Sequence, residues 1–206
     1  DGRAQSDLHI TQLDQHVPVQ SLSATAHDHS TGNIYVSDTA AAVVYCINKH
    51  GHVLFSSAVG VVCKPQGLSL CRRTRRVAVA DGDSLRILRA DDLSPVKVLS
   101  RSSVFGRLTD DFQFQSCCDV AFDAHGFLYA VDSGANRVMV FDCSFVNVAT
   151  FGSHGSDDGQ FNSAQGVCVD GTGKVFVSDN TRVQMFHRQG GHVVSLLPSS
   201  FDKKLT

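Results

Sequence analysis

The amino-acid sequence predicts an all-β fold built from four similar antiparallel sheets. A strand-like run that ends in Asp recurs at Asp38, Asp81, Asp132 and Asp179, with spacings of 43, 51 and 47 residues. All 20 acidic residues are Asp, which favours turns, whereas Glu favours helices. Gly-containing turns separate the short apolar runs. Small sheets of this kind cannot bury their own faces, so a repeat period in the forties is typical of β-propeller blades.

The first two repeat units span about residues 21–60 and 61–105. Each contains four short apolar runs separated by turn residues, as expected for a four-stranded antiparallel blade. The expected strands of the first unit are 22–26, 33–37, 43–47 and 52–55, and those of the second are 67–71, 76–80, 85–89 and 96–99. Residues 8–13 also alternate between apolar and polar types, so we expect residues 1–20 to be an outer strand or a linker from a neighbouring blade.

The last two units, about residues 106–152 and 153–200, show the pattern most clearly. Gly171 and Gly173 permit a tight first turn in the fourth unit, and Gly190 and Gly191 permit its third turn. The expected strands of these units are 119–123, 127–131, 137–141 and 146–151, followed by 166–170, 174–178, 182–186 and 192–197.

The fourth unit resembles an NHL repeat through Gln165-Gly-Val-Cys-Val-Asp170, Val177-Ser-Asp179 and Arg182-Val-Gln-Met-Phe186. The third unit is similar through Asn136-Arg137-Val138, which follows Asp132. The first two units depart from the pattern: where the family has Arg, they have Ala42 or Val43 and Ser84 or Leu85. Propellers of this family usually have six blades. The resemblance therefore implies that the four readable blades are part of a larger, about six-bladed propeller.

Composition restricts the function classes. The net charge of −2 gives no overall attraction to nucleic acid or anionic lipid, and no apolar run reaches the roughly 18–20 residues of a membrane helix. The chain opens on Asp1, and we expect it to be a piece of a longer protein. Its seven cysteines lack the spacing of a zinc site. We expect free thiols in the cytoplasm or another reducing intracellular compartment.

Two sets of charged residues are candidate sites. Asp132 can reach Arg137 and Asp179 can reach Arg182 across the second turn, and such pairs would hold that turn in a structural role. The second set is the first turn of the second unit, where four guanidinium groups fall within five residues and could bind an acidic protein or phosphate. These residues are Arg72, Arg73, Arg75 and Arg76.

The sequence favours a non-catalytic propeller that acts as a protein–protein interaction scaffold within a larger protein or complex. None of the common hydrolase, zinc-protease or phosphate-loop motifs is present, so we expect no catalytic residue, metal or small-molecule cofactor. The family resemblance implies two alternatives. One is an RNA-binding propeller of the tripartite-motif type, and the other is a metal-dependent propeller lyase or hydrolase.

Overall fold

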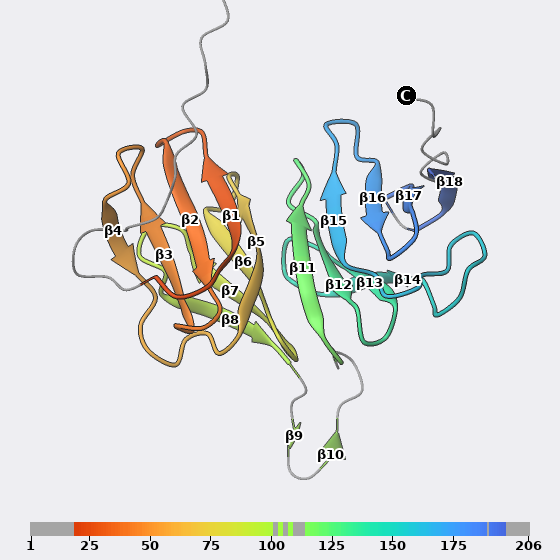
Figure 1. Ribbon diagram of the computed structural model, residues 1–206, viewed down its shortest axis with the longest axis horizontal. Helices are drawn as coiled ribbons and strands as arrows, with labels where there is room; N and C mark the ends of the chain where they lie inside the picture. Colours follow the sequence, from red (N-terminus) through yellow and green to blue (C-terminus); the bar gives the residue numbers. More distant parts are fainter. Residues whose placement is uncertain (1–18, 101–102, 105–106, 109–113, 189, 197–206) are drawn as a thin grey trace, which may run out of the picture.

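A computed structural model describes residues 19–100, 103–104, 107–108, 114–188 and 190–196. Within them the chain forms four four-stranded antiparallel sheets, each with its strands in sequence order (Figure 1). This arrangement confirms the predicted all-β fold of four antiparallel units. We call the sheets blades 1 to 4. No helix in this part of the chain is long and apolar enough to cross a lipid bilayer.

The strand bounds of the four blades are as follows. Blade 1 contains β1 (Leu22–Asp28), β2 (Asn33–Asp38), β3 (Val43–Ile47) and β4 (Val53–Ser56). Blade 2 contains β5 (Pro65–Cys71), β6 (Arg76–Asp81), β7 (Ser84–Arg89) and β8 (Pro95–Leu99). Blade 3 contains β11 (Cys117–Phe122), β12 (Leu128–Asp132), β13 (Arg137–Phe141) and β14 (Asn147–Phe151). Blade 4 contains β15 (Gly166–Val169), β16 (Val175–Ser178), β17 (Val183–Phe186) and β18 (His192–Leu196). A short ribbon, β9 (Ser103–Val104) with β10 (Arg107–Leu108), connects blades 2 and 3.

The expected strands agree with the observed ones to within two residues at each described end. The largest differences fall on the innermost strands: β1 ends two residues later than expected, and β5 and β11 begin two residues earlier. The early starts of β5 and β11 coincide with register shifts near their first residues, which interrupt the regular alternation. Two expectations cannot be compared in this way: residues 8–13 and residue 197 lie outside the described part of the chain.

The blades pack face to face, with the innermost strands β1, β5, β11 and β15 side by side in that order. Each junction has its own apolar core, contributed by the facing surfaces of two neighbouring sheets. The second strands of blades 2 and 3 are therefore buried on both faces, and β12 has all five side chains buried. Burial between two sheets explains why these strands read as continuous apolar runs rather than alternating ones.

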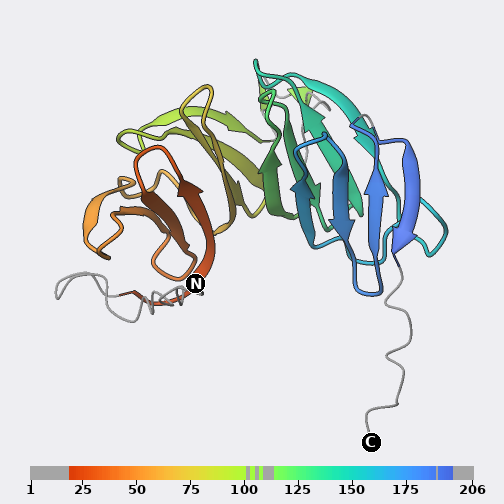
Figure 2. The same cartoon turned by 90° about the horizontal axis from the view of Figure 1, so that it is seen from above.

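Blades 1 and 4 lie at the two ends of an arc, as Figure 2 shows. The side of blade 4 that faces away from blade 3 carries apolar side chains that are half-buried or exposed. We call this surface the open face of blade 4. By register, its members correspond to positions on β11, β12, β13 and β14 that pack between blades 3 and 4. They are Cys168, Phe176, Val183, Met185, Val194 and Leu196.

Candidate functional site

The recurrent Asp at the end of each second strand is a buried hydrogen-bond acceptor. Asp132 is fully buried and accepts hydrogen bonds of 2.9 Å from the backbone N–H groups of Gln115 and Ser116, which directly precede β11. Asp81 accepts in the same way from Cys63 and Lys64, which precede β5. Asp38 accepts hydrogen bonds from the backbone N–H groups of Gln20 and Ser21. Asp179 accepts one from the backbone N–H group of Asn162. Each carboxylate thus joins its turn to the start of its own blade.

At Asp38 and Asp179 these hydrogen bonds favour the charged form of the carboxylate. Burial alone would raise the pKa of Asp38, but the N–H groups of Gln20, Ala41 and Ser21 hold it below its ordinary value. The pKa of Asp179 is likewise lowered: burial opposes ionisation, and donors from Thr181, Asn162 and Arg182 outweigh it. A short side chain at the turn is required for this geometry, which accounts for Asp rather than Glu.

Three of the four blades add an arginine to this carboxylate. Arg137 Nη2 lies 3.0 Å from Asp132 Oδ2, with Nε at 3.1 Å from the same oxygen. Arg182 approaches Asp179 less closely, at 3.8 Å, and its Nη2 donates instead to the backbone carbonyl groups of Asp157 and Gln160 in the connection between blades. Its side chain is only 9% exposed, so Arg182 acts mainly as a support for this loop.

Sequence reasoning missed the equivalent pair in blade 2. Arg86 Nε lies 2.9 Å from Asp81 Oδ2, although the family pattern places its Arg at Ser84 or Leu85. Blade 2 has a shorter second turn in which Asp81 pairs directly with Ser84, so its arginine lies two residues farther along the strand. The detectable signal was the spacing, because Arg86 follows Asp81 by five residues, as Arg137 follows Asp132.

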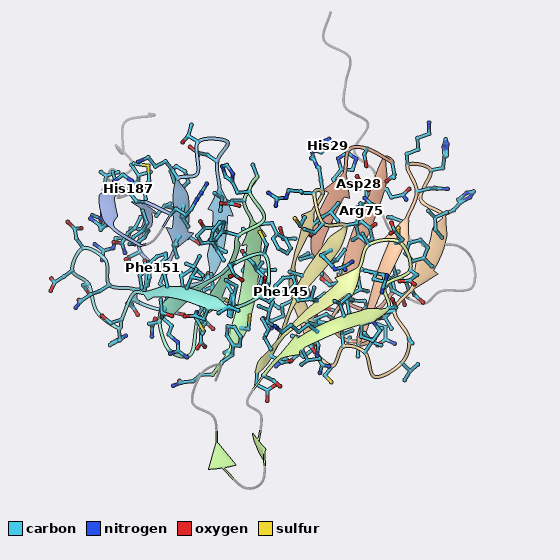
Figure 3. The ribbon with its side chains drawn as sticks, turned by 180° about the vertical axis from the view of Figure 1, so that it is seen from behind. Asp28, His29, Arg75, Phe145, Phe151 and His187 are labelled. Carbon is cyan, nitrogen blue, oxygen red and sulfur yellow. The ribbon has the colours of Figure 1, made fainter. Side chains whose placement is uncertain are left out.

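The four arginines of the first turn of blade 2 do not share one role. Arg75 forms ion pairs with two carboxylates, that of Asp28 in blade 1 and that of Asp91, whose Oδ1 is 2.9 Å from Arg75 Nη2. Figure 3 shows Asp28 and Arg75 side by side. Burial by itself would raise the pKa of Asp28, but hydrogen bonds from Ser30 and Arg75 hold it well below its ordinary value. Arg75 therefore joins two blades.

The backbone of Arg75 is also unusual. Its φ of 52° lies in the left-handed region that favours glycine, and the residue occupies the position of Gly32 (φ 76°) in the first turn of blade 1. A non-glycine residue in this conformation costs on the order of 1 kcal/mol. The ion pair with fully buried Asp28 gives a physical reason for Arg here.

Arg72, Arg73 and Arg76 differ from Arg75 because none of them pairs with a carboxylate in the described part of the chain. Arg72 and Arg73 are exposed and Arg76 is half-buried. Arg73 donates to the backbone carbonyl of His125 in blade 3 at 3.2 Å, and Arg76 donates weakly to the carbonyl of Arg75 at 3.4 Å. Arg72, with His27, lowers the pKa of exposed His29, which indicates a positive local potential.

A hollow of about 400 Å³ opens beside these arginines, at the junction of blades 2 and 3. Its lining combines Arg72 and Arg73 with apolar groups and one acidic residue, Asp123. Asp123 is already occupied: its Oδ1 accepts from the N–H groups of His125 and Phe127, and its Oδ2 lies 3.2 Å from Arg188 of blade 4. The hollow is therefore positively charged on one wall and apolar on another. The apolar members of the lining are Leu70, Cys71, Phe122 and Ala124.

The blades thus present two different faces. The first and third turns form one, which we call the first-turn face, and it carries the hollow and Arg72 to Arg76. The second turns and the connections between blades form the opposite face, which carries the buried Asp positions and the exposed pair Asp157 and Asp158. Among the described residues, no three His, Cys or Asp side chains gather closely enough to hold a metal ion.

Comparisons with known proteins agree with this architecture. Over 48 residues, 22% of this chain, it is 44% identical to protein lin-41 of Caenorhabditis elegans. Over 101 residues, 47% of the chain, it is 28% identical to human NHL repeat-containing protein 3. The matched segments are 4% and 29% of those proteins, so the chain spans less than a third of either relative. No family model matches the sequence.

Solved structures match nearly the whole chain. A streptogramin B lyase structure superposes with a TM-score of 0.69 at 8% identity, over 90% of this chain and 57% of that one. A chain of the nidogen/laminin complex gives a TM-score of 0.67 at 16% identity, over 87% and 65%. At such identities the likeness shows the fold alone, and this fold is that of a β-propeller. Together with the sequence similarity to these relatives, it supports a β-propeller domain built from NHL-like repeats.

Proposed function

We propose that this propeller is a non-catalytic binding module that docks an acidic segment of a partner protein on its first-turn face. The observation that carries the proposal is the pair of exposed guanidinium groups, Arg72 and Arg73, beside the hollow between blades 2 and 3. Exposed like charges repel one another, and an anionic partner would relieve that repulsion. Arg can also bind a carboxylate through two parallel hydrogen bonds.

The surroundings of the hollow favour a peptide over a nucleic acid. Leu70 and Phe122 offer an apolar wall against which an aliphatic side chain can pack. Recognition of single-stranded RNA relies on aromatic side chains that stack on successive bases, and Phe122 is the one aromatic group in this lining.

The matched nidogen/laminin structure is a complex of two proteins, and the matched lyase shows that the same fold also supports catalysis. The fold alone therefore does not decide between a protein-binding module and an enzyme.

The free cysteines and the expected reducing compartment fit such an intracellular scaffold. All seven cysteines are unpaired in this structure. We propose that the domain works in the cytoplasm or another reducing intracellular compartment, as one module of a larger protein. We propose neither a cofactor nor an enzymatic activity for it.

The decisive experiment measures binding of a fluorescent poly-aspartate peptide, and of an oligouridine RNA of equal charge, at two salt concentrations. The test variant replaces Arg72, Arg73 and Arg76 with Ser and retains Arg75, because Arg75 supports the fold. The matched control removes three lysine charges that lie outside the hollow and outside the arginine turn, through Lys49→Ser, Lys64→Ser and Lys174→Ser.

We expect the test variant to lose at least about tenfold in peptide affinity at low salt, and the control to lose less than about twofold. Equal losses in the two variants would show that only overall charge matters and would reject the proposed site. RNA binding that is tighter than peptide binding, with a steep dependence on salt, would instead support the nucleic-acid alternative.

A further inference from the structure

Two cysteines from different blades converge on one glycine. Cys71 ends β5 in blade 2, and Cys143 lies in the turn between β13 and β14 in blade 3. Their sulfur atoms lie 3.8 Å and 3.2 Å, respectively, from the point that a Cβ would occupy on Gly126. Gly126, with φ of 91°, has no side chain to separate them. We propose that Cys71 and Cys143 form an oxidation-sensitive pair that can join blades 2 and 3 through a disulfide bond.

Both sulfur atoms are within reach of a small reagent. Cys143 is exposed, and its thiol donates a weak hydrogen bond to the backbone carbonyl of His125 at 3.4 Å. Cys71 is buried, but it lines the hollow that contains Arg72 and Arg73. These guanidinium groups favour the approach of an anionic oxidant such as glutathione disulfide. The oxidant can therefore react first at the exposed sulfur of Cys143, and the sulfur of Cys71 lies on the same glycine for the second step.

The other five cysteines have no such arrangement. Cys117 and Cys118 are adjacent on β11, so their side chains point to opposite faces, into the core of blades 2 and 3 and into that of blades 3 and 4. Cys46 lies in the core between blades 1 and 2. Cys63 lies on the opposite face beside Arg86, and Cys168 belongs to the open face of blade 4. Oxidation should therefore select one pair among the seven thiols.

The chemistry balances in two exchange steps. The Cys143 thiolate attacks one sulfur of glutathione disulfide, which forms a mixed disulfide and releases one glutathione thiolate. The Cys71 thiolate then attacks the Cys143 sulfur, which forms the bond between the blades and expels the second glutathione thiolate. The two cysteines lose two electrons and their two thiol protons, and one glutathione disulfide gains the electrons to become two glutathione molecules.

The test exposes the folded protein to glutathione disulfide, quenches it with an alkylating reagent, and maps linked peptides by mass spectrometry without reductant. We expect the thiol count to fall from seven to five, with one peptide pair that links Cys71 to Cys143. Cys71→Ser should stop at a glutathione adduct on Cys143. Cys143→Ser should leave Cys71 a free thiol, and Cys168→Ser, the control, should link as the unaltered protein does.

Repeating the oxidation in denaturant separates geometry from intrinsic reactivity, because unfolded chains should give mixed pairings. If the folded protein instead accumulates glutathione adducts on both cysteines without a link, or links other pairs as readily, the proposal is wrong. A selective link that raises the midpoint of thermal unfolding relative to the reduced protein would further support a bridge between the blades.

Discussion

At the scale of single residues, Arg75 shows how one side chain can belong to two blades. Its backbone adopts a conformation that glycine takes at the same place in blade 1, and its guanidinium group neutralises the buried Asp28. Removing the guanidinium would leave a buried carboxylate without its ion pair, with Ser30 and Thr31 as its donors. The ion pair and the strained backbone have opposite effects on stability.

We predict that Arg75→Gly destabilises the domain by about 1–3 kcal/mol, because the loss of a partner for a buried charge outweighs the relief of backbone strain. Urea unfolding measures the change. Arg72→Ser is the matched control, since Arg72 is exposed in the same turn and forms no ion pair among the described residues; it should change stability by less than about 0.5 kcal/mol. An Arg75→Gly variant as stable as the unaltered protein would show that the ion pair contributes nothing net.

The contribution of Asp28 should depend on pH. Its folded-state pKa is depressed, so the stabilisation is present above the ordinary Asp pKa of about 4 and declines as the pH falls below it. The stability difference between the unaltered protein and Arg75→Gly should therefore be full near neutral pH and should shrink in acid. Urea unfolding at neutral pH and at a series of acid values measures it. A difference that grows as the pH falls would contradict this assignment.

At the scale of elements, the buried Asp at each second turn fixes the start of its own blade. Asp81 and Asp83 provide a matched test, because they lie in the same turn and only Asp81 is buried. We predict that Asp81→Ala costs about 2–4 kcal/mol, since it leaves the N–H groups of Cys63 and Lys64 and the guanidinium of Arg86 without their acceptor. Asp83→Ala should be nearly neutral in denaturant unfolding. Equal costs for the two would mean that Asp81 acts only as a turn residue.

The strands were predictable because they follow a local rule. Runs such as 35–38 and 129–132 combine β-forming residues with a turn-forming Asp, and both lie in second strands. The partners of that Asp were less predictable. Arg86 was missed because the turn of blade 2 is shorter, and the ion pair of Asp28 had no sequence signal because its partner Arg75 lies 47 positions away. Sequence spacing shows contacts within a blade, whereas contacts between blades depend on how the sheets pack.

The first turn of blade 2 also shows that sequence spacing does not reveal contacts between blades. The sequence indicated four equivalent charges, but the structure separates Arg75, which supports the fold, from three arginines without a carboxylate partner in the described part of the chain. The convergence of Cys71 and Cys143 on Gly126 had no sequence signal, because the three residues lie in different elements: the end of β5, the turn before β12 and the turn after β13.

At the scale of the whole molecule, residues at equivalent positions of two blades can be buried in one blade and partly exposed in the other. Val140 is 1% exposed between blades 3 and 4, while its counterpart Met185 lies on the open face of blade 4. We predict that Val140→Asp costs more than about 3 kcal/mol, because it buries an unpaired charge. Met185→Asp should cost about 1 kcal/mol or less in this chain. Thermal and urea unfolding of the two variants measure the difference.

A comparable cost at Met185 would show that this face is covered in solution, for example by a second copy of the chain. Measuring the mass of the unaltered protein and of Met185→Asp in solution distinguishes that case. If the face instead receives a further sheet in a longer protein, Met185→Asp should become costly only in that longer protein.

Each blade is formed by one uninterrupted stretch of chain, and these stretches contain 35, 35, 35 and 31 residues in blades 1 to 4. Under tension applied to the two ends, the outermost strand of a sheet would peel from a single neighbour, and its hydrogen bonds would break one after another. A sheet that opens in this way releases about 120 Å of chain at roughly 3.4 Å per residue. The domain would therefore extend in a series of similar steps and would absorb mechanical work gradually rather than fail at once.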